Sequence, residues 1–600
     1  MDMLGGRGDQ NMKEAQQMKE DTTSNQNPSF VVKPAQRKAN LNAVGGGYGR
    51  RAFLGRVMGV AAASMAGLRV VSGKEGEPGA AEVEPKSSLP KGALKRRDEA
   101  YKIRREAAVF EKEQPIALHP DNGDDALFEN RIGSYSKGLP HNELGEVDSN
   151  AYRQLLAALE SGDPAEFEAI PMIGGLKLAD PQAAYCFEME GADSHRLGMV
   201  PPPAFSSAWA AGEMVELYWR ALLRDVPFMK YSTDPLAAQA AADLSALSDF
   251  RGPKSDGAVR LDTLFRGNTP GDLTGPYISQ FLLRDIPYGA MTIVQRYRTT
   301  LAGDDHMTDY GVWLKIQNGM PPTTANKFDP TSRYIRNGRD LAEFVHRDFT
   351  YQAFLNACLI LLSFGRAALD STSPYLASAI QDGFVTFGSP HILDLVARVT
   401  NAALRAAWCQ KWLVHRRLRP EMFAGRVHNR VAGMADFRIP SAVSNYYPIH
   451  SDVFNSKAAD KVFGKTGAYL LPQAYPEGSP LHPSYPSGHA AIAGACATVL
   501  KAFFKESFLI PNPAQANSDG LTLLPVPGLR FTIGGELNKL AANIGLGRDY
   551  AGIHWRSDTT ESLKLGEAVA ISILQNVKTT THRDFAGFSL TKFDGTTVTV

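Results

Sequence analysis

Residues 481–489 read LHPSYPSGH and run directly into the apolar segment AAIAGACATVLKAFF (490–504). A proline followed by Ser487 and an Ala-rich run is typical of a helix start. Unpaired N–H groups at such a start favour an anion, and Gly488 lets the anion approach the backbone closely. His489 comes next and can donate or accept a proton. An ordinary helix cap at Ser487, with His489 as a plain polar residue, fits the same letters, so both interpretations stay open.

A basic stretch, KWLVHRRLRP (411–420), lies upstream of this segment. Pro420 disfavours a helical conformation at Arg419, so a helix that contains Lys411 should end there. Lys411 and Arg419 could then meet on one anion from a helix and its exit turn. A run of Lys and Arg is also typical of a solvated helix face, and this stretch alone does not decide between the two.

A third polar stretch, GRDYAGIHWRSD (547–558), lies downstream. Arg548 and His554 are six apart, which on one unbroken helix places them on different faces. Gly552 offers a break that lets both turn inward. His554 and Asp558 are four apart, a spacing at which a carboxylate can hold one imidazole nitrogen and fix the tautomer. A histidine held in this way serves as a metal ligand or a nucleophile, although an ordinary helix-surface pair has the same spacing.

The composition describes an ordinary globular chain. Of 600 residues, 44% are hydrophobic and 21% charged, and 64 Lys and Arg balance 63 Asp and Glu, so no global field attracts nucleic acid. No apolar run reaches the roughly 18 residues of a membrane span, and we expect a soluble protein with a buried helix at FLNACLILLS (354–363). Four distant cysteines predict small buried side chains and no disulfide framework.

Helical periodicity dominates the chain from about residue 150 onward. The expected helices cover residues 151–160, 207–223, 236–247, 341–364, 392–414, 490–504, 535–546 and 557–575, with short strands at 290–296 and 596–600. This pattern predicts a mainly α fold, with helical bundles in a single large domain and few short strands. The domain should span residues 95–600, with the catalytic motifs within 408–558.

The N-terminal part has a different character. Residues 1–48 are polar and Gly-rich, which predicts a disordered extension. Residues 49–68 begin GRRAFLGR and continue into a short apolar run, which resembles a twin-arginine export signal but also fits a basic turn before a short helix. Residues 69–94 are typical of a linker. The segment 95–113 predicts an amphipathic helix, either solvated or packed on a partner subunit.

The three stretches together form the pattern Lys-x7-Arg-Pro, Pro-Ser-Gly-His and Arg-x5-His-x3-Asp. This pattern resembles the signature of vanadium haloperoxidases and the related acid phosphatases. Longer stretches of residues 125–600 resemble red-algal bromoperoxidases, among them SKGLPH, LFRGNTPGDLTGPYISQF, EGSPLHPSYPSGHA, GELNKLAANIGLGRDYAGIH and KFDGTT. The resemblance implies a vanadate cofactor and a homo-oligomer, either a dimer or a dodecamer.

The resemblance also assigns roles to single residues. His554 should bind vanadium, with Asp558 orienting its imidazole. His489 should be the acid/base, assisted by His482 as a second histidine and by Lys411, which polarises bound peroxide. The residues expected to hold the vanadate oxygens are Lys411, Arg419, Ser487, Gly488 through its N–H, and Arg548.

Some positions depart from the related patterns. Gly547 stands where phosphatases usually have Ser, which points away from a phosphatase. Trp408 stands where red-algal enzymes have Arg and brown-algal and fungal enzymes have Trp, whereas His482 fits bromoperoxidases. Residues 365–383 do not reproduce the acidic calcium-binding loop of the red-algal enzymes. We therefore expect bromide as substrate, with iodide and weaker chloride oxidation, and no calcium site.

The implied reaction is the vanadate-dependent oxidation of bromide by hydrogen peroxide to hypobromous acid, which then halogenates small organic acceptors. No haem-attachment motif is present, and we expect no haem. Two other functions stay open at this point. An acid phosphatase would use His554 as nucleophile, and an inactive oxyanion-binding oligomer would keep the fold without the chemistry. The signal-like segment predicts export to the periplasm or the medium, and a cytoplasmic protein is the alternative.

Overall fold

The computed structural model describes residues 95–432, 447–582 and 584–600. Residues Pro90–Val600 belong to one compact unit. The predicted extension (1–48), export signal (49–68) and linker (69–94) lie outside the described residues. Among the helices that are described, none is both long and apolar enough to cross a membrane.

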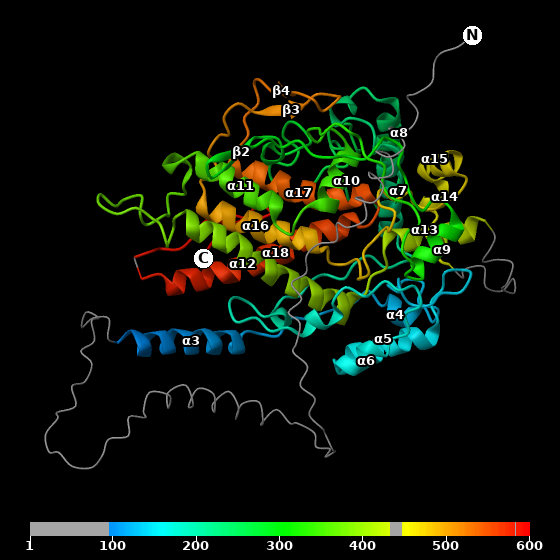
Figure 1. The fold of residues 1–600 in the computed structure, drawn as a ribbon, viewed down its shortest axis with the longest axis horizontal. Coiled ribbons are helices and arrows are strands. Elements are labelled where there is room, and N and C mark those ends of the chain that lie inside the picture. Colours follow the sequence, from blue (N-terminus) through cyan, green and yellow to red (C-terminus); the bar gives the residue numbers. More distant parts are fainter. Residues whose placement is uncertain (1–94, 433–446, 583) are drawn as a thin grey trace, which may run out of the picture. The chain divides into compact units, whose positions relative to one another are not determined.

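The described chain is mainly helical, which confirms the predicted fold class (Figure 1). The longer helices are α3 (Arg96–Glu113), α5 (Ser149–Ser161), α7 (Ala208–Leu222), α8 (Pro235–Ser245), α9 (Tyr310–Gln317), α10 (Gly338–Arg347), α11 (Gln352–Ser363), α12 (Ser389–Cys409), α13 (Pro420–Val431), α15 (Lys457–Thr466), α16 (Gly488–Phe503), α17 (Ile533–Ala551) and α18 (Arg556–Thr580). The short ones are α4 (Asp124–Leu127), α6 (Pro164–Glu168) and α14 (Asp452–Asn455).

The strands form small antiparallel hairpins at the periphery. They pair β1 (Ile286–Tyr288) with β2 (Met291–Ile293), β3 (Ala514–Ala516) with β4 (Leu523–Pro525), and β5 (Ser589–Thr591) with β6 (Thr597–Thr599). The strand expected at 290–296 is the second arm of the first hairpin, in which Ile286 lies opposite Ile293. The tail strand expected at 596–600 pairs with β5.

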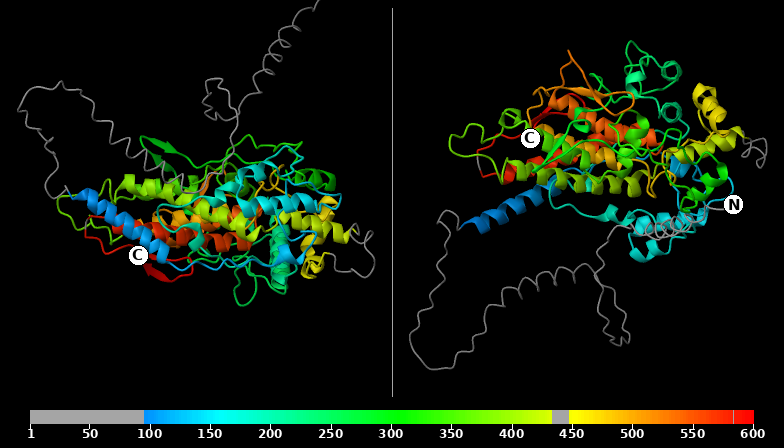
Figure 2. Two further views of the ribbon diagram at one scale, coloured as in Figure 1. Left: turned by 90° about the horizontal axis from the view of Figure 1, so that it is seen from below. Right: turned by 45° about the horizontal axis from the view of Figure 1, so that its top comes forward.

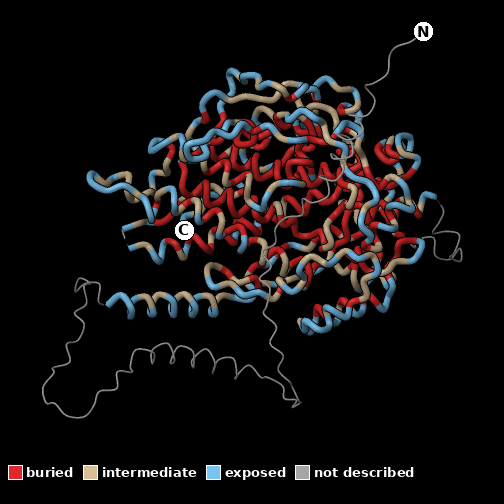
Figure 3. The backbone as a smooth tube through the Cα atoms, in the orientation of Figure 1, coloured by how far each residue is buried: buried red, intermediate tan, exposed pale blue. Residues whose placement is uncertain are grey.

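The core is built around α16, which packs against α12, α17 and α18 (Figure 1). Figure 3 shows these helices as mostly buried backbone. An added Cβ at Gly494 would lie 2.2 Å from the Leu563 carbonyl oxygen, and one at Gly566 would lie 1.9 Å from the Ala491 carbonyl oxygen. The Ala- and Gly-rich composition of α16 therefore lets its backbone lie against that of α18, which larger side chains would prevent.

Two predicted helices end differently in the structure. The continuous helix expected over 341–364 is divided into α10 and α11, because Asp348 adopts an extended conformation (ψ 139°) and ends α10. The helix expected over 392–414 becomes a π-helical turn after Cys409, from Gln410 to His415. Periodicity does not reveal either change, since the apolar spacing continues across both points.

The cysteines only partly follow the prediction. Cys358 and Cys496 are buried, but Cys186 is exposed and Cys409 is half-buried, so the expectation of four buried side chains is wrong for Cys186. All four are free thiols.

The ends of four core helices meet at one place. Figure 2 shows the helical bundle from two further sides. Lys411 follows α12 and donates from Nζ to the Pro483 carbonyl oxygen, 2.6 Å away, just before α16 begins. Arg419 donates from Nη1 to the Ile553 carbonyl oxygen at 2.9 Å, in the turn between α17 and α18. The fold therefore brings the three polar stretches of the sequence together.

Candidate active site

Lys411 lies within the π-helical turn, and Arg419 follows this turn by four residues. Lys411 is buried, and its Nζ donates to the carbonyl oxygens of Pro483 (2.6 Å) and Ser484 (2.9 Å). Arg416 then takes a left-handed conformation (φ 39°), Arg419 is extended (ψ 153°), and α13 begins at Pro420. The helix that contains Lys411 ends at His415, four residues before the end predicted at Arg419, and Arg419 itself is extended, as the following Pro420 favours.

Arg419 joins the other two stretches through its guanidinium. Its Nη2 lies 3.0 Å from Nδ1 of His482 and donates to the His482 carbonyl oxygen at 2.9 Å. Its Nη1 lies 3.0 Å from Nε2 of His554. Because a guanidinium only donates, Nε2 of His554 must accept, so His554 carries its hydrogen on Nδ1. Nδ1 of His482 also lies 3.1 Å from the Pro483 carbonyl oxygen.

The start of α16 faces this cluster. Ser487 caps the helix, with its hydroxyl accepting from the Ala490 N–H at 3.4 Å, while its own N–H donates to Ser562 Oγ at 2.7 Å. The N–H groups of Gly488 and His489 donate to no acceptor in the described part of the chain. The capping and anion-binding interpretations are thus compatible, since the cap leaves two amides for a ligand.

The third stretch turns inward at Gly552, as predicted. Gly552 has φ +87°, which only glycine adopts without strain, and it ends α17 two residues before His554. Arg548 lies in the last turn of α17 and donates from Nη1 to the Val345 carbonyl oxygen at 2.6 Å. Its buried Nε has no hydrogen-bond partner among the described residues. One donor of this guanidinium is therefore left for a ligand.

His554 is held by Asp558. Its Nδ1 donates to Asp558 Oδ2 at 2.8 Å, and both side chains are buried. His554 precedes α18, whereas Asp558 lies in its first turn and also accepts from the Trp555 N–H at 3.2 Å. The four-residue spacing therefore brings the two side chains together across the start of α18, and not along one face of a continuous helix. It leaves Nε2 of His554 unprotonated on the site side, where its lone pair accepts from Arg419 in this structure.

Asp558 is itself part of a buried ionic network. Arg417 donates to Asp558 Oδ1 at 2.6 Å and to Glu213 Oε2 on α7 at 2.9 Å, and the Ser484 hydroxyl donates to Asp558 Oδ2. Burial alone would raise the pKa of Asp558, but the Arg417 charge and the His554 hydrogen bond outweigh it and hold this pKa below its usual range. The carboxylate therefore stays ionised.

Three buried cations remain without an acidic partner. Lys411, Arg419 and Arg548 form no ion pair with any carboxylate in the described ranges. Burial, together with the charges of Arg419 and Arg548, lowers the pKa of Lys411 well below its usual value, and burial lowers the pKa of Arg419 to about 10. Buried charges are costly unless paired. A bound anion would supply the missing charge.

Two further histidines border the cluster. His489 is partly exposed, and its Nε2 lies 3.2 Å from Asp348 Oδ1. His482 is buried against the Trp408 ring, with centroids 4.8 Å apart. Burial and the nearby Lys411 charge lower the pKa of His482 well below its usual value, so this imidazole is neutral.

The structure thus brings together all of the residues predicted for the site, and it adds others that the sequence analysis missed. Asp348 reaches His489 from the break between α10 and α11, and Val345 supplies a carbonyl oxygen to Arg548. Arg417 lies in the basic stretch identified from the sequence, so sequence analysis could have included it among the site residues. Glu213 lies far away in the sequence, and no local pattern points to it.

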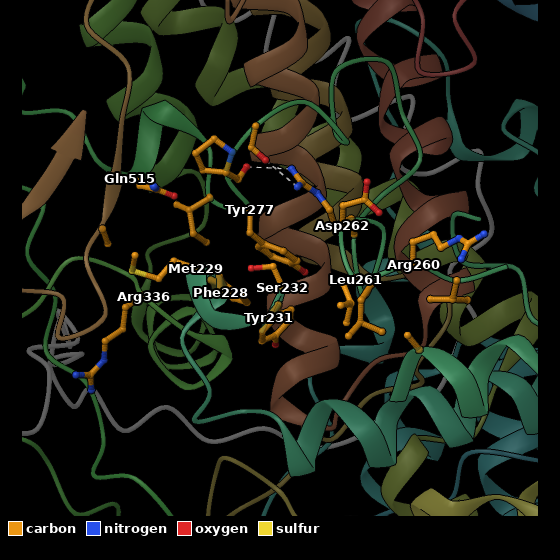
Figure 4. Close-up of a pocket in the computed structure, with 18 of the residues that line it drawn as sticks. Phe228, Met229, Tyr231, Ser232, Arg260, Leu261, Asp262, Tyr277, Arg336 and Gln515 are labelled. Atoms are coloured by element: carbon orange, nitrogen blue, oxygen red, sulfur yellow. Dashed lines mark hydrogen bonds between the residues drawn. The ribbon is translucent and has the colours of Figure 1, made fainter. Parts of the chain in front are cut away.

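A large cavity in the described chain lies elsewhere. It has a volume of about 920 Å³ and is lined by Phe228, Tyr277, Arg336 and Gln515, among others (Figure 4). The Tyr277 hydroxyl already donates to the Phe265 carbonyl oxygen at 2.6 Å. None of the predicted site residues lines this cavity, so its size does not identify the site.

We expect the fold to lose stability in mild acid because of its buried histidines, two of which, His141 and His415, are not among the predicted site residues. Burial lowers the pKa of both His141 and His415 to about 3. Between pH 6.5 and pH 3 the unfolded chain is protonated at these residues and the folded chain is not, so protonation favours unfolding. The free energy of unfolding should fall by about 1.4 kcal/mol per pH unit for each histidine, measured by urea denaturation of vanadate-free protein.

The variant His415→Phe serves as the comparison, because neither His415 nitrogen has a partner among the described residues. His141 and His415 together make the free energy of unfolding depend on pH. The variant should remove about one half of this joint dependence. An unchanged slope in the variant would contradict this origin of the acid sensitivity.

The fold and the site together define a class of protein. A helical bundle whose helix ends hold unpaired buried cations, free helix-start amides and an oriented histidine is suited to bind a tetrahedral oxyanion. A family model described as the VCPO second helical-bundle domain matches residues 464–583, which include α16, α17 and α18.

Comparison with named relatives identifies the family within this class of oxyanion-binding proteins. Vanadium-dependent bromoperoxidases of Corallina officinalis and Ascophyllum nodosum are each 36% identical to this chain, and the alignments cover 80% of it and 92% and 88% of the relatives. The chain therefore belongs to the vanadium-dependent bromoperoxidase family. The homohexameric structure of the second vanadate-dependent bromoperoxidase from Ascophyllum nodosum has a TM-score of 0.78 at 30% identity, covering 89% of this chain and 95% of that one.

Proposed function

We propose that this protein oxidises bromide with hydrogen peroxide in a vanadate-dependent reaction and releases hypobromous acid or its equivalent. The observation that carries the proposal is the convergence of Lys411, Arg419 and Arg548, all buried without a carboxylate partner. The names of the relatives supply the cofactor and the halide. Iodide, weaker chloride oxidation and halogenation of small organic acceptors belong to the same proposal.

The residues present fit vanadate. The Lys411, Arg419 and Arg548 side chains, the Ser487 hydroxyl and the Gly488 N–H would hold its oxygens. His554 would bind vanadium through Nε2, the nitrogen that Asp558 leaves unprotonated. When bound, vanadate supplies a Lewis acid that activates hydrogen peroxide toward attack by bromide. Neither haem nor calcium is part of the proposal.

The other side chains handle protons and exclude water. His489, held at Nε2 by Asp348, would accept a proton from peroxide and return it to the product. His482 is neutral and buried against Trp408, so it would assist His489 without adding a further positive charge. Lys411, kept close to the site by two carbonyl oxygens, would polarise the bound peroxide.

Two further parts of the proposal concern assembly and location. We propose a homo-oligomer, because the related Ascophyllum enzyme of similar fold is homohexameric, and a dimer or dodecamer are the specific assemblies to test. We also propose export through the twin-arginine-like stretch at 49–68, which lies outside the described residues. Cleavage of this stretch on secretion would support export.

The deciding experiment removes bound oxyanions from the purified protein and then adds peroxide and bromide with or without orthovanadate. We expect bromination only with orthovanadate, because the unpaired cations need an anion and phosphate offers no comparable peroxide chemistry. Parallel samples in vanadate-free buffer are tested for phosphate-ester hydrolysis.

The second candidate, an acid phosphatase, uses the same cations for phosphate and His554 as nucleophile. Ester hydrolysis without bromination would establish the phosphatase instead. Loss of both activities, with orthovanadate still bound, would show an oxyanion-binding protein without the chemistry.

A further inference from the structure

Four large apolar side chains are exposed on two extended segments. Ile116 is 77% exposed and Leu118 87%, while Phe187 is 81% exposed and Met189 98%. Ala117 and Glu188, which lie between the two members of each pair, are partly buried. We call these four side chains the apolar surface. Exposed apolar groups gathered in this way mark an interaction site far more often than isolated ones do.

The two segments lie side by side. The Asp193 N–H donates to Glu111 Oε1 at 3.0 Å, and His119 Nε2 lies 3.1 Å from the His195 carbonyl oxygen. Residues 115–122 make no backbone–backbone hydrogen bonds with the described part of the chain. Their backbone is therefore not engaged in strand pairing with these residues, and the side chains of Ile116 and Leu118 are open to a partner.

Ion pairs with α12 hold Phe187 and Met189 outward. Glu188 pairs with Arg405 at 3.1 Å, and Glu190 pairs with Arg398 at 2.9 Å. With the two glutamates fixed on α12, Phe187 and Met189 are left pointing away from the protein, 81% and 98% exposed. The ion pairs of the folded chain therefore keep Phe187 and Met189 exposed.

The helix α3 leads into the same region and is also uncovered. It has 18 residues and none is buried, as its exposed and intermediate backbone in Figure 3 shows. A helix of this length gains little stability without tertiary packing. Arg196 is its main anchor, through an ion pair with Glu111 at 3.1 Å.

We propose that the apolar surface and α3 form an interface with a second copy of this chain. This inference rests on the homo-oligomer in the proposed function and assigns the surface that builds it. The charge pattern of α3 favours a second copy over an unrelated partner. The first ten residues carry an excess of basic side chains, namely Arg96, Arg97, Lys102, Arg104 and Arg105 against Asp98 and Glu99.

The rest of α3 has the opposite excess. Its acidic residues are Glu106, Glu111 and Glu113, against Lys112. In a two-fold symmetric dimer the same surface meets itself, and two copies of α3 would run antiparallel. The basic half of each helix would then lie against the acidic half of the other, which makes the helix complementary to itself.

The first test compares sedimenting mass across full-length variants. In the double variant Phe187→Asp with Met189→Asp, we expect the self-dissociation constant to rise by roughly 30-fold or more and the mass to fall, because charges would replace the apolar contacts. The matched control is Ile380→Asp, since Ile380 is 90% exposed on a different loop. The control should keep the wild-type mass, and bromination activity reports that each variant is folded.

The second test exchanges charges on α3 and does not depend on the apolar residues. One variant carries Arg104→Glu and Arg105→Glu, and the other carries Glu106→Lys and Glu113→Lys. Each alone should dissociate, because like charges would meet across the two-fold axis. A mixture of the two should associate again as mixed oligomers, which only a self-complementary contact allows.

The outcomes separate this inference from the proposal on which it rests. Wild-type protein that is monomeric at all concentrations would overturn both. An oligomer whose mass is unchanged in the Phe187/Met189 variant and in both charge variants would overturn only the assigned surface. Monomeric protein that floats with phosphatidylcholine vesicles would assign the surface to a lipid and also contradict the inference.

Discussion

The variant His554→Ala is expected to lose bromination by about a thousandfold or more, to the level seen without orthovanadate, since a Lewis-acid cofactor supplies several kcal/mol of transition-state stabilisation. Nε2 of His554 is the one imidazole nitrogen that the neighbouring Asp558 leaves as an acceptor within the cation cluster. Alanine offers no ligand there. The measurements are bromination rate and vanadium content after equilibrium dialysis.

A histidine distant from the site provides the control for this variant. His391 lies near the start of α12, a helix of 21 residues whose other end leads to Lys411. At the rise of an α-helix this separation is about 30 Å. The variant His391→Ala should keep its vanadium and its activity. Full vanadium content in His554→Ala would place the ligand elsewhere and contradict the assignment.

Replacing Asp558 with alanine should have the second-largest effect, on both stability and cofactor binding. The carboxylate is buried and accepts from Arg417, His554, Ser484 and the Trp555 N–H. Breaking a buried ion pair costs about 3–5 kcal/mol of unfolding free energy. Loss of the group that orients a metal-binding histidine typically weakens metal affinity about 10- to 100-fold. Urea denaturation and vanadate titration measure the two effects.

Variants at two other carboxylates distinguish the effect on stability from the effect on vanadate binding. Glu213→Gln removes the second carboxylate on Arg417 but leaves the His554 contact, so it should lower stability while vanadate affinity is retained. Asp256→Asn removes an exposed ion pair with Arg260, keeps a residue that tolerates the positive φ at this position, and should change stability by less than about 1 kcal/mol. If Glu213→Gln weakened vanadate binding as much as Asp558→Ala, orientation of His554 would not explain the loss.

Much of the site was predictable because its signals are local. Pro420 begins α13 and keeps Arg419 extended, the helix start after Pro486 provides free amides, and Gly552 permits the turn before His554. Each feature depends on the backbone preferences of one or two residues. Residue identity and spacing therefore sufficed to select these positions, and the resemblance to a known family gave them roles.

Other features were decided only by the tertiary structure. Asp348 meets His489, and Val345 meets Arg548, across large separations in sequence. The break that frees Asp348 falls inside an apolar pattern that predicted one continuous helix over 341–364. Packing of α10 against α17 sets the position of this break, and local periodicity carries no information about that contact.

The sequence by itself determined the helical class of this protein, the three stretches that form the site and the cations that they contribute. It could not show that Lys411, Arg419 and Arg548 lack acidic partners, while Arg417 from the same basic stretch is paired with Asp558 and Glu213. Charge pairing depends on distance and burial in three dimensions, and neighbouring arginines of one chain segment can face opposite sides. Only the folded chain therefore distinguishes the cations left for an oxyanion from those that hold the structure together.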